Sequence, residues 1–252
     1  MKRILKIKVT QNGKALLNIG CGTIMHRDWN NLDFSPYAFL KRHGIIRFFF
    51  LSLSLISNNQ SKKLAKIDPK IIFWDVRKGL PFDDNKFDVI YSSHLIEHLS
   101  KADAIFLLRE CHRSMKKEAV IRIATPDLEK LFLIYSETIN RKRKNIRQHL
   151  KAIELIFEQI VRIEPARLSK QKGLTKIIQR LIRKSALSAG EVHKWLYDKY
   201  SLHYYLKKSG FKNITIFDHK ASNINDWRKY NLDLDPNGNP HKPLSLYIEA
   251  EK

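Results

Sequence analysis

Cysteine is scarce in this chain, which has only Cys21 and Cys111 among its 252 residues. Two cysteines cannot build a disulfide framework, and this excludes the small secreted domains that depend on one. The scarcity fits a reducing compartment, so we expect the protein in the cytoplasm. The first twenty residues have no continuous apolar core and no small-residue cleavage site, so no signal peptide is predicted.

Long apolar runs are also missing. The longest, residues 45–56, is interrupted by Arg47, Ser52 and Ser54. A helix that crosses a bilayer needs about 20 apolar residues, so no membrane span is predicted. Basic edges around an apolar centre are typical of segments that lie on a membrane surface. We therefore expect a cap near the ligand site that could contact an anionic membrane, with ordinary core packing as the alternative.

Acidic residues are few, since 25 Asp and Glu stand against 47 Lys and Arg and give a formal net charge of +22. An excess of this size favours an anionic partner, such as nucleic acid, acidic lipid or an acidic glycan. The basic residues are scattered, however, and the densest run, residues 141–144, is only four long. A lysine-rich composition without a binding role is the alternative interpretation.

Short apolar runs alternate with helical patterns along the chain. Strands are expected at residues 14–19, 29–33, 71–74, 87–91, 119–123, 214–217 and 244–248. Helices are expected at 101–116 and 201–209, and a charged helical insertion at about 128–190. This order predicts one α/β domain over residues 1–252, with a mostly parallel seven-stranded sheet, helices on both faces and an antiparallel hairpin at the edge.

A glycine turn follows the first predicted strand, at Gly20-Cys21-Gly22. Glycines there let the backbone turn sharply and approach a ligand closely. Asp33 ends the second strand, where its carboxylate can accept hydrogen bonds from two ribose hydroxyls. Asp75 ends the third, where it could bind an adenine amino group. Together they indicate a nucleoside ligand, although either acid alone is as readily a turn or cap residue.

A dinucleotide-dependent dehydrogenase is the competing interpretation of the glycine turn. The third glycine of its G-x-G-x-x-G motif is absent, and Asp33 lies closer than the usual 20 or so residues. A parallel crossover normally takes a dozen residues or more, so the helix between the first two strands must be reduced to about one turn. The absent third glycine and the short spacing to Asp33 both argue against the dehydrogenase.

Several blocks of the chain resemble the class I S-adenosylmethionine-dependent methyltransferases, most closely the type 11 predicted methyltransferases associated with surface-polysaccharide biosynthesis. The similar blocks are residues 17–22, 29–36, 80–99, 107–113, 122–127, 193–198 and 209–211. The resemblance implies a Rossmann-like fold and S-adenosylmethionine as cofactor. It implies cofactor contacts at Gly20, Cys21, Gly22, Asp33, Asp75, Val76 and Ser92. Asn18 stands where many relatives place an acid, which removes an expected contact to the cofactor's amino group.

The block after the fourth strand contains His94-Leu95-Ile96-Glu97-His98, which has the order of an inverted zinc motif. That motif needs both histidines on one face of a helix. Here the five residues directly follow a strand, where methyltransferases place cofactor and acceptor contacts. We interpret the match as accidental and predict no metal ligands.

Two histidines are candidates for the base that removes a proton from the acceptor. His94 follows the fourth strand, and His193 lies near Asp198, which could orient its ring. Trp195 and Tyr197 beside His193 could stack on a sugar or a base, or could simply pack on the core. His193 is the preferred candidate, with His94 and Asp198 as the other catalytic residues.

The resemblance and these histidines favour methylation of a sugar hydroxyl of a glycan or a related small molecule. A nucleic-acid methyltransferase is favoured by the charge, but the chain lacks an Asn/Asp-Pro-Pro-aromatic motif and a catalytic Pro-Cys. The third alternative is a protein that binds the cofactor without transferring its methyl group. The intact glycine turn and acids argue against this last alternative.

Overall fold

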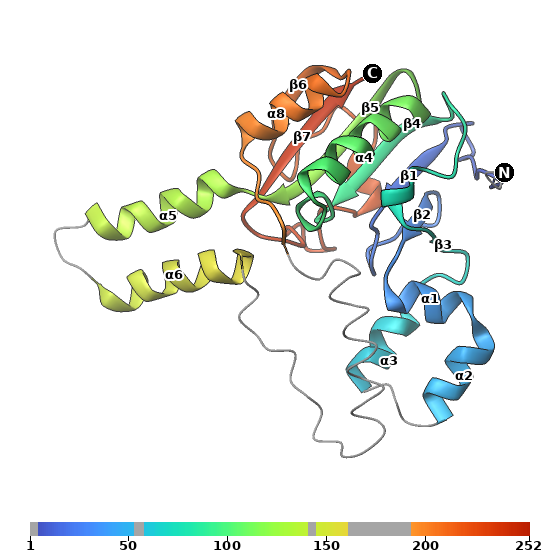
Figure 1. Ribbon diagram of the computed structural model, residues 1–252, viewed down its shortest axis with the longest axis horizontal. Helices are drawn as coiled ribbons and strands as arrows, with labels where there is room; N and C mark the ends of the chain where they lie inside the picture. Colours follow the sequence, from blue (N-terminus) through green and yellow to red (C-terminus); the bar gives the residue numbers. More distant parts are fainter. Residues whose placement is uncertain (1–4, 53–57, 141–144, 161–192) are drawn as a thin grey trace.

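The computed structural model describes residues 5–52, 58–140, 145–160 and 193–252. Within this part, seven strands form one sheet in the order β3-β2-β1-β4-β5-β7-β6 (Figure 1). The strands are β1 (Leu16–Ile19), β2 (Asn30–Asp33), β3 (Ile72–Phe73), β4 (Phe87–Ser93), β5 (Met115–Pro126), β6 (Lys212–Phe217) and β7 (Ser245–Glu251). The first five run parallel, and β7 is antiparallel to β5 and β6. The predicted Rossmann-like α/β sheet with an antiparallel edge is confirmed.

The described α-helices are α1 (Pro36–Arg42), α2 (Gly44–Ser52), α3 (Asn58–Ala65), α4 (Lys101–Ser114), α5 (Leu128–Asn140), α6 (Ile146–Ile160) and α8 (Lys199–Lys208). Short 3-10 helices are η1 (Val76–Lys78), η2 (Ile96–His98) and η3 (Trp227–Tyr230). The start of α4 is fixed by Ser100, which accepts a hydrogen bond from the Asp103 amide. No helix in the described ranges combines the length and the apolar character that a membrane crossing requires.

The two faces of the sheet are covered differently. One face packs on α4 and α8 through aliphatic residues such as Leu17, Ile90 and Leu108. Over β1 and β4, the opposite face packs on η3 through an aromatic cluster that includes Trp29 and Tyr91. A helix was expected on this face as well. Aromatic side chains each bury a large apolar area, so a short irregular segment replaces a long helix here.

The connection from β1 to β2 contains no α-helix, although the short interval predicts about one helical turn. The amides of Gly20 and Cys21 donate to the Leu32 carbonyl at 2.8 and 3.3 Å, and this folds the connection back on β2. The chain after β1 is therefore held at the carboxyl edge of the sheet, where ligands of such sheets bind.

The expected insertion begins as a helical hairpin that projects from the body of the molecule (Figure 1). Helices α5 and α6 contact each other, and Thr138 Oγ1 lies 2.8 Å from His149 Nδ1 across the hairpin. The end of α6 returns to the carboxyl edge of the sheet, where Leu155 and Gln159 line a pocket. The remainder of the predicted insertion, residues 161–190, lies outside the described residues.

Candidate active site

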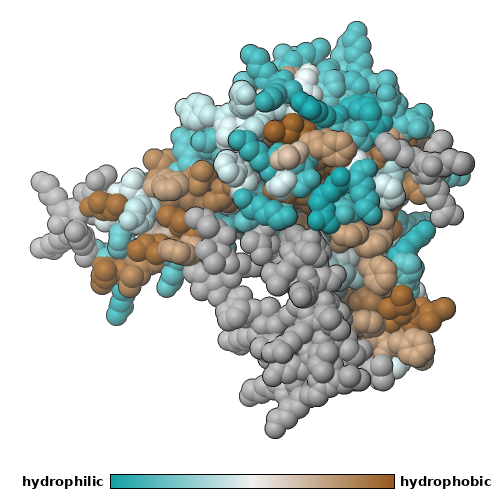
Figure 2. All heavy atoms as spheres, in the orientation of Figure 1, coloured by the Kyte–Doolittle hydropathy of each residue, from teal (hydrophilic) through white to brown (hydrophobic). Residues whose placement is uncertain are grey.

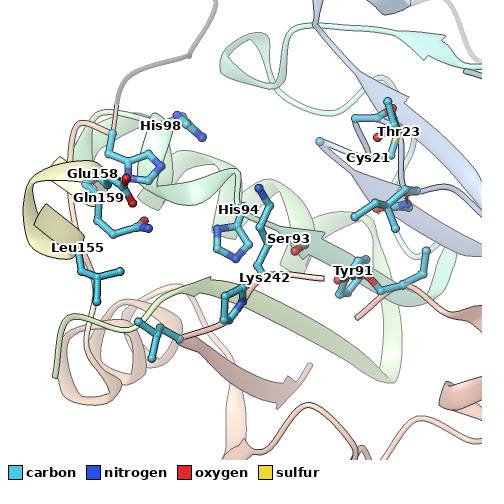
Figure 3. A pocket seen from close by; sticks show the side chains of 18 residues that line it. Cys21, Thr23, Tyr91, Ser93, His94, His98, Leu155, Glu158, Gln159 and Lys242 are labelled. Atoms are coloured by element: carbon cyan, nitrogen blue, oxygen red, sulfur yellow. Dashed lines mark hydrogen bonds between the residues drawn. The ribbon is translucent and has the colours of Figure 1, made fainter. Parts of the chain in front are cut away.

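A cavity of about 510 Å³ opens at the carboxyl ends of β1 and β4. This volume is typical of a small-molecule site. One end of the cavity is formed by the glycine turn, Gly20 to Gly22, and the other by His98, His193 and the end of α6. Figure 3 shows His94 between these two ends, with Cys21 and Thr23 on one side and His98 on the other.

The glycine turn requires its glycines. Gly20 and Gly22 have φ values of +69° and +51°, in the left-handed region that favours glycine. A Cβ on Gly20 would lie 2.9 Å from Leu95 Cβ, so any larger residue would clash with the segment after β4. A Cβ on Gly22 would meet no atom of the described residues within 4 Å. The space beside Gly22 is therefore open to a ligand.

Asp33 holds the glycine turn in place. Its carboxylate accepts hydrogen bonds from the Gly22 amide at 2.8 Å and the Ser35 amide at 2.6 Å. Asp33 is buried, and each carboxylate oxygen keeps further acceptor capacity. The structure thus brings together the glycine turn and the strand-end acid that the sequence singled out.

Of the predicted cofactor residues, only Gly20, Cys21 and Gly22 line this pocket, and Asp33 lies behind them. Asp75 caps η1 and forms a bidentate ion pair with Arg77, in which each of the two hydrogen bonds is 2.8 Å long. Burial would raise the pKa of Asp75, but the Arg77 hydrogen bonds outweigh it and hold the pKa below its usual value. Val76 is buried in the core. Ser92 is also buried, and its neighbour Ser93 lines the pocket because successive side chains on a strand face opposite sides.

A buried carboxylate lies beside His94. Glu97 is 0% exposed, and its Oε1 atom lies 3.0 Å from His94 Nδ1. The second ring nitrogen of His94 lies 2.8 Å from Ser245 Oγ. Burial alone would raise the pKa of Glu97, but His94 and His98 together hold it below the usual value. His94 therefore sits in a fixed position between β7 and a buried acid.

His193 lies in the same pocket, at the carboxyl edge of the sheet. The amides of Lys194 and Trp195 donate to the Glu97 carbonyl at 2.7 and 3.2 Å, which anchors this segment beside η2. The Nδ1 atom of His193 bonds the Gln159 carbonyl, and its Nε2 atom lies 4.0 Å from Glu97 Oε1. The sequence analysis missed Glu97 as the carboxylate partner, although it lies within the His94–His98 motif.

Asp198 caps a helix in the structure and is not among the residues that line the pocket. Its carboxylate caps α8 and accepts from the Ser201 amide at 2.7 Å and the Ser201 hydroxyl at 2.6 Å. Helix capping is a common role for an aspartate just before a helix. Tyr197 is buried in the core, in agreement with the packing alternative, whereas Trp195 is 43% exposed.

Comparisons with known proteins agree with this geometry. Residues 17–123 match the family model described as a methyltransferase domain. No curated protein matches the chain.

Three solved structures illustrate the structural similarity. An S-adenosylmethionine-dependent methyltransferase from Archaeoglobus fulgidus is 18% identical, with 94% of this chain and 85% of that chain covered and a TM-score of 0.39. A putative one from Listeria monocytogenes is 13% identical, with coverages of 94% and 89% and a TM-score of 0.41. Phosphoethanolamine N-methyltransferase 2 from Haemonchus contortus, in complex with S-adenosyl-L-methionine, is 12% identical, with coverages of 100% and 50% and a TM-score of 0.39.

The family match covers residues 17–123, less than half of the chain. It spans the glycine turn, Asp33 and the His94–His98 segment, which the structure gathers at one edge of the sheet. Residues 17–123 therefore match a methyltransferase domain, in support of S-adenosylmethionine-dependent methyl transfer.

Proposed function

We propose that the protein transfers the methyl group of S-adenosylmethionine to a hydroxyl group of a glycan or a related small molecule. One observation carries this proposal. A single cavity has the glycine turn at one end and His193, close to the buried Glu97, at the other. A hydroxyl group is a poor nucleophile, so its methylation gains from a nearby proton acceptor.

The glycine end of the cavity fits the cofactor. The backbone of Gly20, Cys21 and Gly22 would hold it, since the space beside Gly22 is open, and Asp33 would accept hydrogen bonds from its ribose. The bound cofactor supplies a methyl group that its positively charged sulfur has already activated. The protein then has to align the acceptor and remove one proton.

His193 is suited to take that proton. Its Nδ1 atom donates to the Gln159 carbonyl, so the neutral ring carries its free lone pair on Nε2, near Glu97. The acceptor oxygen forms a bond to the methyl carbon as the carbon–sulfur bond breaks, and the hydroxyl proton moves to Nε2. The Glu97 carboxylate stabilises the resulting positive charge on the ring. A positioned base of this kind typically contributes about 10²–10⁴-fold in rate.

A contact with an anionic membrane is a further part of the proposal. Helix α2 exposes Ile45, Phe48, Phe49 and Leu51, and basic Lys41, Arg42 and Arg47 lie on or beside it. Figure 2 shows the apolar colour gathered over this part of the surface. An apolar helix face with basic edges favours interfacial binding, as an acceptor linked to a lipid would require. If the protein does not co-sediment with anionic vesicles at low salt, the proposed membrane contact is wrong.

The acceptor class is tested with methyl-labelled cofactor and a cell extract that is fractionated into glycolipid, small molecules and RNA. We expect label in the glycolipid or small-molecule fraction, in a methyl ether that survives mild alkali. Label confined to RNA, or found as an N-methyl group, contradicts the proposal.

The proton acceptor is tested with His193→Ala, compared with His203→Ala at an exposed position on α8. His193→Ala should lower turnover by about 10²–10⁴-fold without changing cofactor affinity, and His203→Ala should change neither. Wild-type turnover in both His193→Ala and His94→Ala would mean that alignment of the acceptor with the cofactor is sufficient and that neither histidine acts as a base.

A further inference from the structure

Three potential metal ligands meet at the acceptor end of the pocket. Glu97, His98 and His193 each offer one donor atom, and these atoms all lie within 4.8 Å of one another. We propose that these three side chains bind a divalent metal ion of the zinc type, which holds and activates the acceptor hydroxyl. The role in catalysis rests on the proposed function, but metal binding itself does not.

The buried carboxylate is the strongest reason for the proposal. Glu97 Oε1 receives no hydrogen bond of acceptable geometry from the described residues, although His94 Nδ1 lies 3.0 Å away. A fully buried carboxylate oxygen without a donor costs considerable free energy. This atom also faces His193 Nε2, at 4.0 Å. A cation between the two would give the oxygen its missing partner.

The surroundings of the cluster have the hydrogen bonds that metal ligands usually make. A ligating histidine commonly donates its other ring nitrogen to a backbone carbonyl, and His193 Nδ1 bonds the Gln159 carbonyl. A ligating carboxylate commonly receives a second hydrogen bond, and Thr125 Oγ1 donates to Glu97 Oε2 at 3.3 Å. Both contacts leave the inward-facing atoms, Nε2 and Oε1, available to a cation.

Two imidazole nitrogens and one carboxylate oxygen form a ligand set of zinc sites that keep an open position. Around one ion, at roughly 2.1 Å from each ligand, such atoms lie about 3.4 Å apart. The donor atoms, which lie up to 4.8 Å apart, therefore have to approach one another by up to about 1.4 Å, which side-chain rotation at the partly exposed His98 and His193 can provide. The remaining position opens on the pocket.

The inverted zinc motif in the sequence therefore includes two residues of this cluster, Glu97 and His98, but assigns the wrong set of ligands. That order assigns His94 and His98 as ligands on one helix, whereas residues 96–98 form only a single turn of 3-10 helix. In the structure His94 positions Glu97, and His193, 95 positions after His98, takes the place of the second histidine. We therefore replace the prediction that the chain has no metal ligands with this proposed site.

A bound ion would change how the hydroxyl is activated. A hydroxyl oxygen at the open position would lose its proton more readily, because the cation stabilises the negative oxygen. His193 then acts as a ligand rather than as the base, and the proton passes to water. The methyl group moves from sulfur to that oxygen, which leaves a neutral thioether and a methyl ether.

The test measures metal binding to the full chain, without donor or acceptor. Protein freed of metal with a chelator is titrated with Zn²⁺ by calorimetry and with Co²⁺ by visible absorption. We expect one tightly bound ion and a rise in the unfolding temperature on adding Zn²⁺. His98→Ala and His193→Ala should each weaken binding by more than about 100-fold, whereas His203→Ala should bind as the wild type does.

Each outcome decides the proposal. No binding by the wild type, or wild-type affinity in both His98→Ala and His193→Ala, overturns it. Should either variant fold poorly, Glu97→Gln serves as the second variant, since it keeps the side-chain volume and removes the charge. Hydroxyl methylation that continues in excess chelator overturns the metal's role but leaves the proposed function intact. Tight metal binding with no hydroxyl product contradicts the proposed function alone.

Discussion

Two clusters of buried charge lie in this protein, and they differ in how completely their atoms are paired. The first is the Arg122 cluster, formed by Arg122, Asp233 and Glu249. Arg122 Nε donates to Asp233 at 2.7 Å, and Nη1 donates to Glu249 at 2.6 Å. Its remaining hydrogen bonds reach backbone carbonyls, and the guanidinium lies over Trp227 and Tyr247. Every charged group in this cluster has several partners.

The second is the Glu97 cluster, formed by His94, Glu97, His98 and His193. Here Glu97 Oε1 has the His94 Nδ1 atom at 3.0 Å but no hydrogen bond of acceptable geometry from the described residues, and the three histidines line the pocket. Buried charge costs several kcal/mol unless it is fully paired. A cluster whose hydrogen bonds are all made therefore serves stability, whereas one that leaves a buried oxygen without a well-formed hydrogen bond beside a cavity indicates a binding or catalytic role.

The largest expected effect on stability comes from breaking the Arg122 cluster. Arg122→Met would leave Asp233 and Glu249 buried without their cation, which should lower the free energy of unfolding by about 3–5 kcal/mol. Chemical denaturation measures this. The control is Lys116→Met, because the Lys116–Asp88 pair is 42% and 27% exposed and should contribute less than about 1 kcal/mol. Equal stability of the two variants would show that the ion pairs of the Arg122 cluster contribute little to the free energy of unfolding.

The next effect concerns the cofactor end of the pocket. Asp33→Ala should weaken S-adenosylmethionine binding by roughly 1.5–3 kcal/mol, because it removes a charge-assisted ribose contact and the Gly22 anchor. Calorimetry measures the affinity. Asp28→Ala is the matched control, since the Asp28 side chain is 40% exposed and pairs with His26 and Arg27 rather than with the glycine turn. Unchanged affinity in Asp33→Ala would remove Asp33 from the site.

The smallest effect tests the corrected role of Asp198. Asp198→Ala should cost about 1 kcal/mol of stability through the lost helix cap and leave turnover of the folded enzyme unchanged. Burial would raise the pKa of Asp198, but the hydrogen bonds from Ser201 outweigh it and keep the pKa below its usual value. The cap therefore stabilises above the unfolded-state pKa of about 3.9, and this is lost as pH falls through the lower folded-state pKa. Denaturation at pH 7 and pH 3 checks this, and a loss of turnover without a loss of stability would restore a catalytic role.

The sequence predicted the fold well because apolar strands and helical periods are local patterns. All seven predicted strands overlap the observed ones. The short interval to Asp33 predicted a helix of about one turn between β1 and β2, and the structure has no helix there. Local patterns also identified Gly20 and Gly22, since a strand that ends in a glycine turn is recognisable without tertiary information.

The site was less predictable because its pairings are long-range. Asp75 and Asp198 were taken as ligand and catalytic residues, and both cap helices instead, a role that a lone aspartate shows equally well in sequence. The pairing of Glu97 with His193 joins residues 96 positions apart through backbone bonds to the Glu97 carbonyl. No spacing rule relates two such positions.

The most direct test of the account is methyl transfer by Glu97→Gln beside the wild type. Because the change keeps the side-chain volume and removes the buried charge beside the pocket-lining His94 and His193, we expect turnover to fall by at least about 100-fold. In metal-free protein, the free energy of unfolding and the affinity for S-adenosylmethionine should stay near wild type, in contrast to Arg122→Met. Wild-type turnover in Glu97→Gln, or a loss of stability as large as that of Arg122→Met, would contradict the functional assignment of the Glu97 cluster.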